Sequence, residues 1–67
     1  MNENEILTIE DVCKKLKLTK NQVYHLTSAR RIPCFKVGKS LRFRMKDIDR
    51  WIDDQMEYYE EGIYGSL

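Results

Sequence analysis

Apolar residues recur at helical spacing in the first third of the chain. A stripe spaced three, one and three residues apart is formed by Ile9, Val12, Cys13 and Leu16. This period predicts an amphipathic helix over residues 9–16. A second helix is expected to begin at Lys20, with an inner face of Val23, Leu26 and Thr27. Pro33 closes this segment, because the residue before a proline avoids the α conformation.

Polar residues at the start of both segments have the spacing of helix N-caps. Thr8 followed by Asp11, and Thr19 followed by Gln22, match capping boxes, in which two side chains satisfy free backbone donors. The carboxylate of Asp11 also lies where the helix dipole favours negative charge. The residues that remain between the two helices, 17–19, are enough only for a tight turn. Two helices joined this closely are the outline of a helix-turn-helix.

After Pro33 the period of the apolar residues changes from helical to two. Residues 34–37 and 41–44 are short alternating runs on either side of Gly38-Lys39-Ser40. This pattern predicts a β-hairpin, with the glycine supplying the turn geometry. On the second strand, Leu41 and Phe43 share one face, and Arg42 and Arg44 share the other.

The helical period returns from about Lys46. One side of this third helix carries Ile48, Trp51, Ile52, Met56 and Tyr59. The register of Trp51 with its apolar neighbours favours a place in the core, and we expect the same of Phe35 and Phe43. Cys13 lies on the apolar stripe of the first helix and is expected to be a small buried residue.

These elements predict a mainly α fold with a small β-hairpin. The architecture is a winged helix-turn-helix, made of a helix-turn-helix, a two-stranded wing and a C-terminal helix. With 67 residues, the chain has room for one small domain. We expect residues 1–7 to be disordered or extended, residues 8–59 to form the winged helix-turn-helix domain, and residues 60–67 to be a flexible acidic aromatic tail.

Formal charge is segregated along the chain, although the total is only +1. Residues 1–11 carry −4, residues 12–46 carry +11 without a single Asp or Glu, and residues 47–67 carry −6. Repulsion between like charges destabilises a compact state, and a polyanion relieves it while releasing its own counterions. We therefore expect a nucleic acid as the partner. An anionic membrane and an acidic protein are the alternatives.

Composition argues against catalysis and against export. A chain of this size buries only about 60% of its unfolded surface, so a deep catalytic cleft is not expected. There is no Ser/His/Asp set, no cluster of metal ligands and no glycine-rich phosphate loop, so we expect no enzyme activity, cofactor, metal or small-molecule substrate. Two cysteines, an acidic N-terminus and the lack of a long apolar run favour a reduced, cytoplasmic setting without membrane contact.

The order of these motifs resembles the excisionase family of small winged helix-turn-helix proteins, close to the MerR-type DNA-binding domain. The resemblance covers residues 8–52 and is carried by LTIEDVCKKLKLTKNQVYHL and then RRIPCFKVGKSLRFRMKDIDRWI. It implies a bacterial, phage or mobile-element protein that binds double-stranded DNA with sequence selectivity. In many members the implied role is DNA bending during excision of a mobile element, and a small transcriptional regulator is the related possibility.

Three positions depart from the pattern of the family. The family often has glycine in the helix-turn-helix turn and near the end of the second helix, where this chain has Lys17 and Arg30. A non-glycine residue in the left-handed region costs on the order of 1–2 kcal/mol, so we expect these two turns to be built differently. The family also often places Arg at the position of His25.

The outer face of the second helix carries the candidate base contacts. An α-helix fits the major groove, and residues early in a recognition helix meet base edges. Asn21 has the donor and acceptor to pair with adenine, His25 has a donor for guanine, and Tyr24 suits a phosphate or a thymine methyl group. Packing is an equal alternative for Tyr24, and an ordinary exposed imidazole is the alternative for His25. The full candidate set is Thr19, Lys20, Asn21, Tyr24, His25 and Ser28.

The candidate wing and phosphate contacts are basic or carry a hydroxyl group. They are Arg30, Arg31, Lys36, Lys39, Ser40, Arg42 and Arg44, with Lys14 and Lys15 as peripheral contacts. We expect the hairpin tip to enter the minor groove or to bind its phosphates, and a solvated hairpin face is the alternative. Phosphate contacts carry little sequence information. Affinity is therefore expected mainly from the wing, and specificity mainly from the second helix.

The acidic aromatic end of the chain is the least expected feature. Met56, Tyr59 and Tyr64 are candidate partner contacts, either with a second copy in a dimer or cooperative array or with a recombinase. A fraying helix end is the alternative. A different class of function also stays open, in which the chain is a protein interaction module of antitoxin or adaptor type whose basic face meets an acidic partner.

Overall fold

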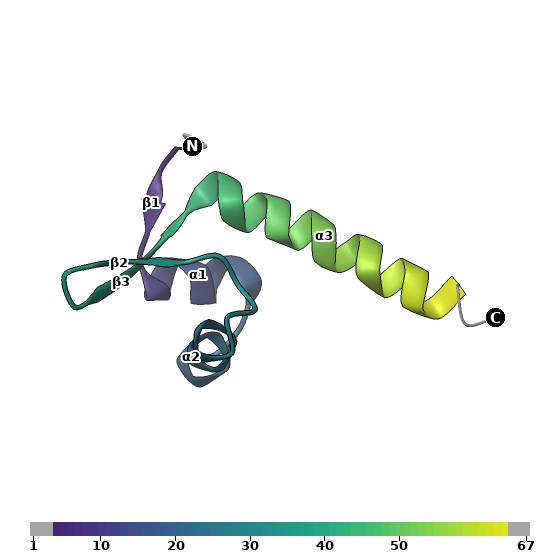
Figure 1. The fold of residues 1–67 in the computed structure, drawn as a ribbon, viewed down its shortest axis with the longest axis horizontal. Helices are drawn as coiled ribbons and strands as arrows, with labels where there is room; N and C mark the ends of the chain where they lie inside the picture. Colours follow the sequence, from purple (N-terminus) through teal and green to yellow (C-terminus); the bar gives the residue numbers. More distant parts are fainter. Residues whose placement is uncertain (1–3, 65–67) are drawn as a thin grey trace.

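The computed structural model describes the backbone of residues 4–64 and the side chains of residues 4–60. Three helices and three short strands make up the fold (Figure 1). In chain order the elements are β1 (Ile6–Leu7), α1 (Ile9–Leu16), α2 (Lys20–Ser28), β2 (Phe35–Val37), β3 (Ser40–Arg44) and α3 (Met45–Tyr64). The predicted fold class, a mainly α helix-turn-helix with a hairpin and a C-terminal helix, is confirmed. Among the described residues, no helix is both long and apolar enough to cross a bilayer.

Both capping boxes form as the sequence predicts. At the start of α1, the Thr8 N–H donates to Asp11 Oδ2 over 3.0 Å, and the Asp11 N–H donates to Thr8 Oγ1 over 3.3 Å. At the start of α2, the Thr19 N–H donates to Gln22 Oε1 over 2.9 Å, and the Gln22 N–H donates to Thr19 Oγ1 over 3.2 Å. Each box satisfies backbone donors that a helix start leaves free. The box at Thr8 therefore fixes where α1 begins, and the box at Thr19 fixes where the turn between the two helices ends.

The sheet has three strands, whereas the sequence predicts two. Antiparallel β1 and β2 flank β3, and Leu7 lies opposite Phe43. The Met45 N–H also donates to the Glu5 carbonyl over 2.9 Å, which ties the N-terminal segment to the start of α3. A strand of two residues has no period to detect in the sequence. The folded unit thus begins before Thr8, because Leu7 is buried in its core.

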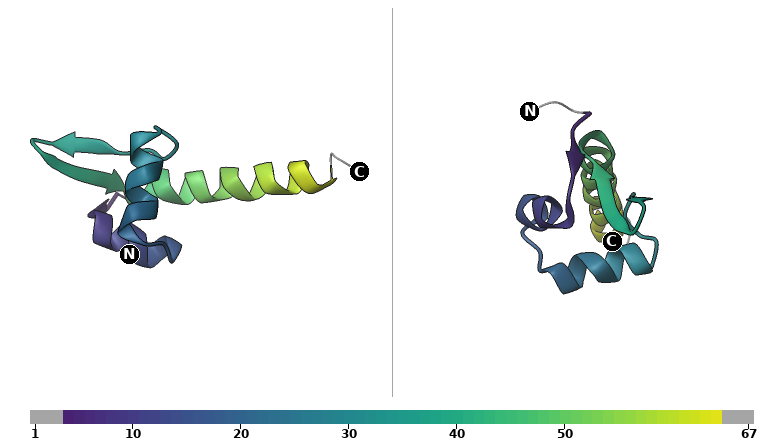
Figure 2. Two further views of the ribbon diagram at one scale, coloured as in Figure 1. Left: turned by 90° about the horizontal axis from the view of Figure 1, so that it is seen from below. Right: turned by 90° about the vertical axis from the view of Figure 1, so that its left-hand side faces the viewer.

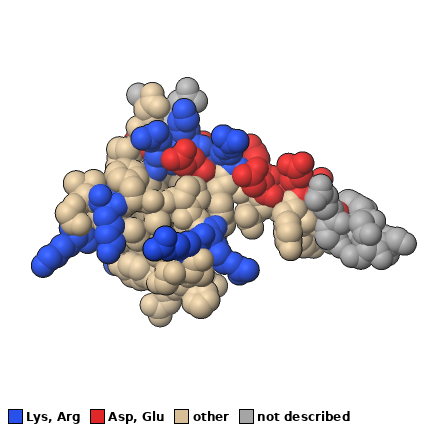
Figure 3. Space-filling model, viewed as in Figure 1, with Lys and Arg blue, Asp and Glu red and all other residues tan. Residues whose placement is uncertain are grey.

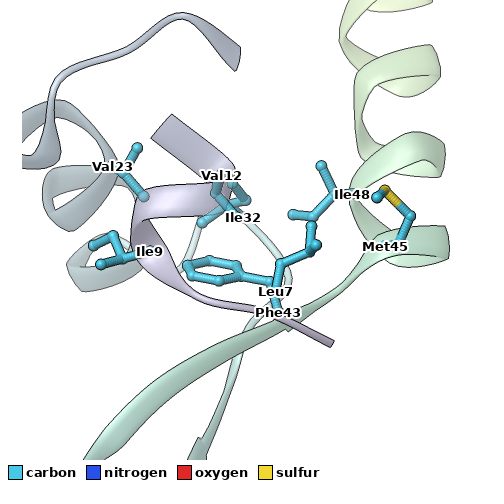
Figure 4. Close-up of a cluster of buried hydrophobic side chains, with 8 residues drawn as sticks. All are labelled: Leu7, Ile9, Val12, Val23, Ile32, Phe43, Met45 and Ile48. Carbon is cyan, nitrogen blue, oxygen red and sulfur yellow. The ribbon is translucent and has the colours of Figure 1, made fainter. Parts of the chain in front are cut away.

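Phe43 on β3 lies at the centre of the core. It is fully buried, and its ring points toward α1, with Leu7 beside it (Figure 4). The rest of the core comes from every helix, from β1 and from the loop before the hairpin, and consists of Leu7, Ile9, Val12, Val23, Ile32, Met45 and Ile48. Leu26 and Trp51 pack against this cluster at its edge. The prediction for Phe35 is wrong, because that side chain is 38% exposed on the hairpin.

Helix α3 leaves the core after its second turn and projects from the rest of the molecule (Figures 1 and 2). Met45 and Ile48 are buried, and Trp51 and Ile52 are half-buried. The indole Nε1 of Trp51 donates to the Arg31 carbonyl over 2.6 Å, which anchors the helix to the loop after α2. Every side chain from residue 53 to residue 60 is exposed. The backbone remains helical to Tyr64, whereas the sequence predicts a flexible tail from residue 60.

The turns after α1 and α2 contain left-handed residues without being glycine. Lys17 has φ 59° and ψ 41°, and Arg30 has φ 56°. After α2, the Arg30 N–H donates to the Thr27 carbonyl and the Arg31 N–H donates to the Leu26 carbonyl, which is the Schellman pattern. The expectation that these two turns avoid a left-handed non-glycine residue is wrong. Both turns contain one, and the chain bears the conformational cost of a side chain there.

Replacing either residue by glycine is expected to stabilise the protein. Relief of the left-handed strain gives about 1–2 kcal/mol, and the greater freedom of glycine in the unfolded chain removes about 0.4–1 kcal/mol of it. We therefore expect Lys17→Gly and Arg30→Gly each to raise the free energy of unfolding by about 0.5–1 kcal/mol. Urea unfolding followed by circular dichroism measures this change.

Lys14→Gly is the matched control, because Lys14 is an exposed lysine within α1. Glycine in a helix interior lowers stability by about 0.5–1 kcal/mol. If the glycine variants at positions 17 and 30 lose stability as the control does, left-handed strain at these turns is refuted.

The capping box of α1 also predicts how stability depends on pH. A hydrogen bond from the Thr8 backbone N–H, with a further one from the Thr8 hydroxyl, lowers the pKa of Asp11 below its ordinary value of 3.8. A carboxyl group with a depressed pKa adds stability above its unfolded pKa and loses it as the pH falls through the folded pKa. The difference in unfolding free energy between the wild type and Asp11→Ala should therefore be constant from about pH 7 to pH 5 and shrink below about pH 4.

Thermal unfolding at several pH values measures this difference. Gln22→Ala removes the equivalent side chain from the capping box of α2, and glutamine does not titrate. Its effect on stability should not change over the same pH range. If the effects of both variants change in parallel, the pH dependence does not arise from the Asp11 carboxylate.

Candidate nucleic-acid interface

Helix α2 has one buried face and one face open to solvent. Val23 is fully buried, and Leu26 and Thr27 are half-buried, as the helical period predicts. The opposite face exposes Asn21, His25 and Ser28, together with Lys20 and Tyr24. Tyr24 is 48% exposed, so part of its side chain packs against the protein and part of it is open to solvent. Nothing in the described part of the chain covers this outer face, because α3 projects away from it (Figure 2).

A groove runs between α2 and the hairpin. It brings together about half of the predicted contact residues, which come from two consecutive segments of the chain. The helix side contributes Tyr24, Ser28 and Arg30, and the hairpin side contributes Lys36, Lys39, Ser40 and Arg42. The groove is also lined by Glu10, Thr27 and Phe35, which the sequence pattern does not predict. Such neighbours depend on where the hairpin lies relative to α2, which no local pattern reports.

The hairpin turn is built as its glycine predicts. Val37 lies opposite Ser40, so only Gly38 and Lys39 form the loop, and Gly38 has φ 63°. A glycine with positive φ at the first loop position is typical of a two-residue hairpin turn. This short loop places the Lys39 ammonium at the tip of the wing. The second strand starts at Ser40, one residue earlier than the sequence pattern indicates.

The strand register divides the wing residues between two faces. Residues directly opposite one another in an antiparallel pair share a face. Phe35 lies opposite Arg42, and Lys36 lies opposite Leu41. Arg42 and Arg44 therefore share a face, as the sequence predicts, whereas Lys36 is on the other face with the partly buried Leu41. The wing thus presents basic groups on both of its faces.

Several predicted contact residues lie outside the groove. Arg31 lies on the side of α3, in a shallow depression with Trp51 and Tyr58, and its carbonyl accepts the indole N–H. Arg44 lies opposite Ile6 at the base of the sheet. The Thr19 hydroxyl is engaged with Gln22 in the capping box. Which of the predicted residues contact a nucleic acid stays a prediction.

Two of the lysines form ion pairs with acidic residues. Lys20 Nζ lies 3.3 Å from Glu10 Oε1, and Lys15 Nζ lies 3.0 Å from Asp49 Oδ1. A hydrogen bond from the backbone N–H of Glu10, together with the Lys20 ammonium, lowers the pKa of the Glu10 carboxyl group. Both members of the Lys20 pair are more than half exposed, so the pair is weak and open to exchange. Lys15, by contrast, is directed to α3.

Charge is also segregated on the surface of the folded molecule. On the face shown in Figure 3, lysine and arginine side chains over the hairpin and over the lower part of the molecule stand apart from acidic groups. At the start of α3, basic and acidic side chains adjoin, and acidic groups continue along that helix. On this face, part of the basic segment therefore lies apart from the acidic groups, and the acidic residues beyond the start of α3 lie along that helix.

Comparison with known families identifies this arrangement. The chain matches the family model described as a helix-turn-helix domain over residues 6–56. It belongs to that family. No curated protein and no solved structure gave a match. A helix-turn-helix domain implies DNA binding and is typically non-enzymatic. The matched region includes β1, the strand that the periodicity of the sequence does not predict.

The ion pair between Glu10 and Lys20 allows DNA binding in the groove to be tested by removing one charge. Glu10 lines the groove and pairs with Lys20, so its carboxylate would repel a phosphate group bound there. Glu10→Gln removes the negative charge and frees the lysine, so we expect duplex DNA affinity to rise about two- to five-fold at low salt. Fluorescence anisotropy with a labelled duplex measures this change.

Asp49→Asn is the matched control, because it also frees a lysine but does so on the α3 side of the molecule. We expect it to change the affinity by less than the Glu10 variant does. An equal gain from both variants would show that overall charge, rather than the groove beside α2, governs binding.

Proposed function

We propose that this chain binds double-stranded DNA with sequence selectivity, placing α2 in the major groove and the hairpin wing against the adjacent backbone. The observation that carries the proposal is the groove between α2 and the wing. Its two sides present Tyr24 and Ser28 on the helix and Lys39 and Arg42 on the hairpin. A phosphate backbone that passes along this groove has basic or hydroxyl groups on both sides, while the exposed face of α2 meets base edges.

The two sides of the groove have different tasks in this proposal. Asn21 and His25 are exposed on α2 and carry the donors and acceptors that discriminate between base pairs. Arg42 and Lys39 on the wing supply positive charge that attracts any sequence. Arg42 Nη1 donates to the Leu41 carbonyl over 2.7 Å, which holds the guanidinium near the strand instead of leaving it free to extend. Specificity then comes from α2 and most of the affinity from the wing.

The biological role that we propose is that of an excisionase-like directionality factor or a small transcriptional regulator. Both roles need a compact protein that recognises a short site and works next to other bound proteins. One copy of an 8.1 kDa domain covers few base pairs, so two or more copies are expected to bind repeated sites. In this role the chain needs no cofactor, and its partners are DNA, further copies of itself and a recombinase.

An exposed surface on α3 favours a second candidate function. Met56 and Tyr59 are 59% and 67% exposed on the projecting part of the helix, which is costly for a protein that meets only DNA. A protein interaction module of antitoxin or adaptor type would use such a surface. A protein complex that survives nuclease treatment, together with no shift of any duplex in a gel, would favour this candidate over DNA binding.

Two alanine substitutions separate the tasks of the wing and of α2. Arg42→Ala should weaken binding to all duplexes by a similar factor and reduce the slope of log affinity against log salt by about 1, because one phosphate contact is lost. Asn21→Ala should instead change the preferred base at one position, at a cost of about 1–3 kcal/mol for the wild-type site. Selection of bound duplexes from a random pool, followed by salt titration on the selected site, measures both effects.

Lys46→Ala is the control for general charge, because Lys46 is exposed at the start of α3 and does not line the groove between α2 and the wing. Loss of general affinity without any change of sequence preference in Asn21→Ala would show that α2 is not the reading helix. An affinity that does not fall between low and moderate salt would contradict the proposed binding to DNA as a whole.

A further inference from the structure

The projecting part of α3, residues 53–60, is an acidic and apolar surface without a partner in the described structure. We call it the arm. Four carboxylates of the arm form no ion pair among the described residues, and they belong to Asp53, Asp54, Glu57 and Glu60. Met56 and Tyr59 continue the apolar stripe that begins in the core at Ile48 and Ile52. A helix stripe that continues beyond the core exposes the kind of surface that another surface usually covers.

The outer face of the sheet is a second surface of this kind, but with the opposite charge. Strand register places Ile6 beside Arg44, Phe35 beside Arg42, and Val37 beside Ser40, all on the face opposite the buried Phe43. Ile6, Phe35 and Val37 are 48%, 38% and 61% exposed. Phosphate binding accounts for the arginines of this face but not for the exposed Ile6 and Val37, which do not line the groove beside α2.

The arm and the outer sheet face are complementary in charge and in character. Each combines exposed apolar side chains with charges of one sign, and the signs are opposite. They cannot meet within one molecule, because the hairpin and the arm extend in opposite directions from the core, along a molecule 46 Å long (Figures 1 and 2). The contact therefore requires two copies, with the arm of one against the sheet of the next.

We infer that the arm of one copy docks on the outer sheet face of a second copy, in a head-to-tail association. An arm-to-arm pair is disfavoured, because it would bring eight unpaired carboxylates together. The arm is about 12 Å long, so the contact is smaller than the roughly 1,200 Å² of stable complexes and is weak. Head-to-tail contacts produce open rows whose length grows with concentration, unless the rotation between successive copies closes a ring.

This association also has a consequence that rests on the proposed function. Arg42 and Ser40 belong to the outer sheet face and to the groove that is proposed to bind DNA. An arm docked on a neighbour then competes with DNA for the wing of that neighbour. At high concentration, the arms of the free protein cover the wings of neighbouring copies. An added duplex displaces the arms and separates the copies.

Sedimentation equilibrium without DNA tests the association separately from the proposed function. At low ionic strength, we expect the average mass of the wild type to rise continuously above that of the monomer between about 10 µM and 1 mM, and to fall back when salt screens the charges. An arm reversal, in which all four acidic residues of the arm are replaced (Asp53→Lys, Asp54→Lys, Glu57→Lys and Glu60→Lys), should abolish the rise. A face reversal, Arg42→Glu with Arg44→Glu, should abolish it as well.

Charge rescue decides which surfaces meet. A chain that carries both reversals should associate again, since its arm is now basic and its sheet face acidic. A pair of Lys14→Glu with Lys46→Glu, two exposed lysines outside both surfaces, is the matched control and should retain association. Circular dichroism checks that each variant is folded, and Arg42→Gln with Arg44→Gln replaces the face reversal if that variant unfolds.

Three results would overturn the inference. The first is a wild type that remains monomeric over the whole concentration range. The second is a face reversal that still associates, which would place the contact between two arms. The third is a doubly reversed chain that does not associate, which would show that the arm and the sheet face are not each other's partners.

Discussion

The burial of Phe43 is the interaction on which the rest of the structure depends. Strand β3 pairs with β1 on one side and β2 on the other, and it also contacts α1 and α3. Because side chains alternate along a strand, burying Phe43 turns Arg42 and Arg44 to the opposite face. The same burial fixes the hairpin over the helix-turn-helix, so the groove beside α2 exists only when this ring is in the core. One apolar side chain thus orients the basic groups that the proposed function uses.

Segregation of charge along the chain becomes segregation in space because the last helix is long and straight. A compact domain of this size would otherwise bring the acids of residues 47–60 close to the basic segment. The Trp51 hydrogen bond to the Arg31 carbonyl and the Lys15–Asp49 ion pair hold the start of α3 against the domain. Beyond them the helix departs, so its carboxylates do not neutralise the wing. The domain keeps an attractive surface for a polyanion although its total charge is close to zero.

Most of the fold could be predicted from local sequence because local chemistry determines it. Capping boxes at Thr8 and Thr19 and the glycine at position 38 act within a few residues, and all three have the geometry that their sequence predicts. What the sequence did not reveal depends on contacts between distant segments. Strand β1 forms only because β3 lies beside it, and Phe35 is exposed because the hairpin extends beyond the helices. Lys17 and Arg30 have positive φ although neither is glycine. Packing of the helices therefore determines the backbone conformation of these turns, even against the local preference of the residue.

The residues of the candidate site could be predicted from the sequence more fully than their arrangement in space. Helical periodicity alone identifies the exposed face of α2, and the structure agrees with it. Periodicity does not show that Arg31 faces α3, that Lys36 and Arg42 lie on opposite hairpin faces, or that Lys20 pairs with Glu10. These relations depend on strand register and on helix packing, and they decide which basic groups act together.

The central claim is that α2 and the wing bind one duplex together while the arm remains free. Titration of the ¹⁵N-labelled protein with a selected duplex, followed by amide chemical shifts in NMR spectra, tests it most directly. The amides of Asn21, His25, Gly38 and Lys39 should shift together and saturate at the same stoichiometry, while those of Tyr58 and Tyr59 should shift no further than they do on dilution of the free protein. Shifts that centre on α3, or that affect the wing without α2, would contradict it.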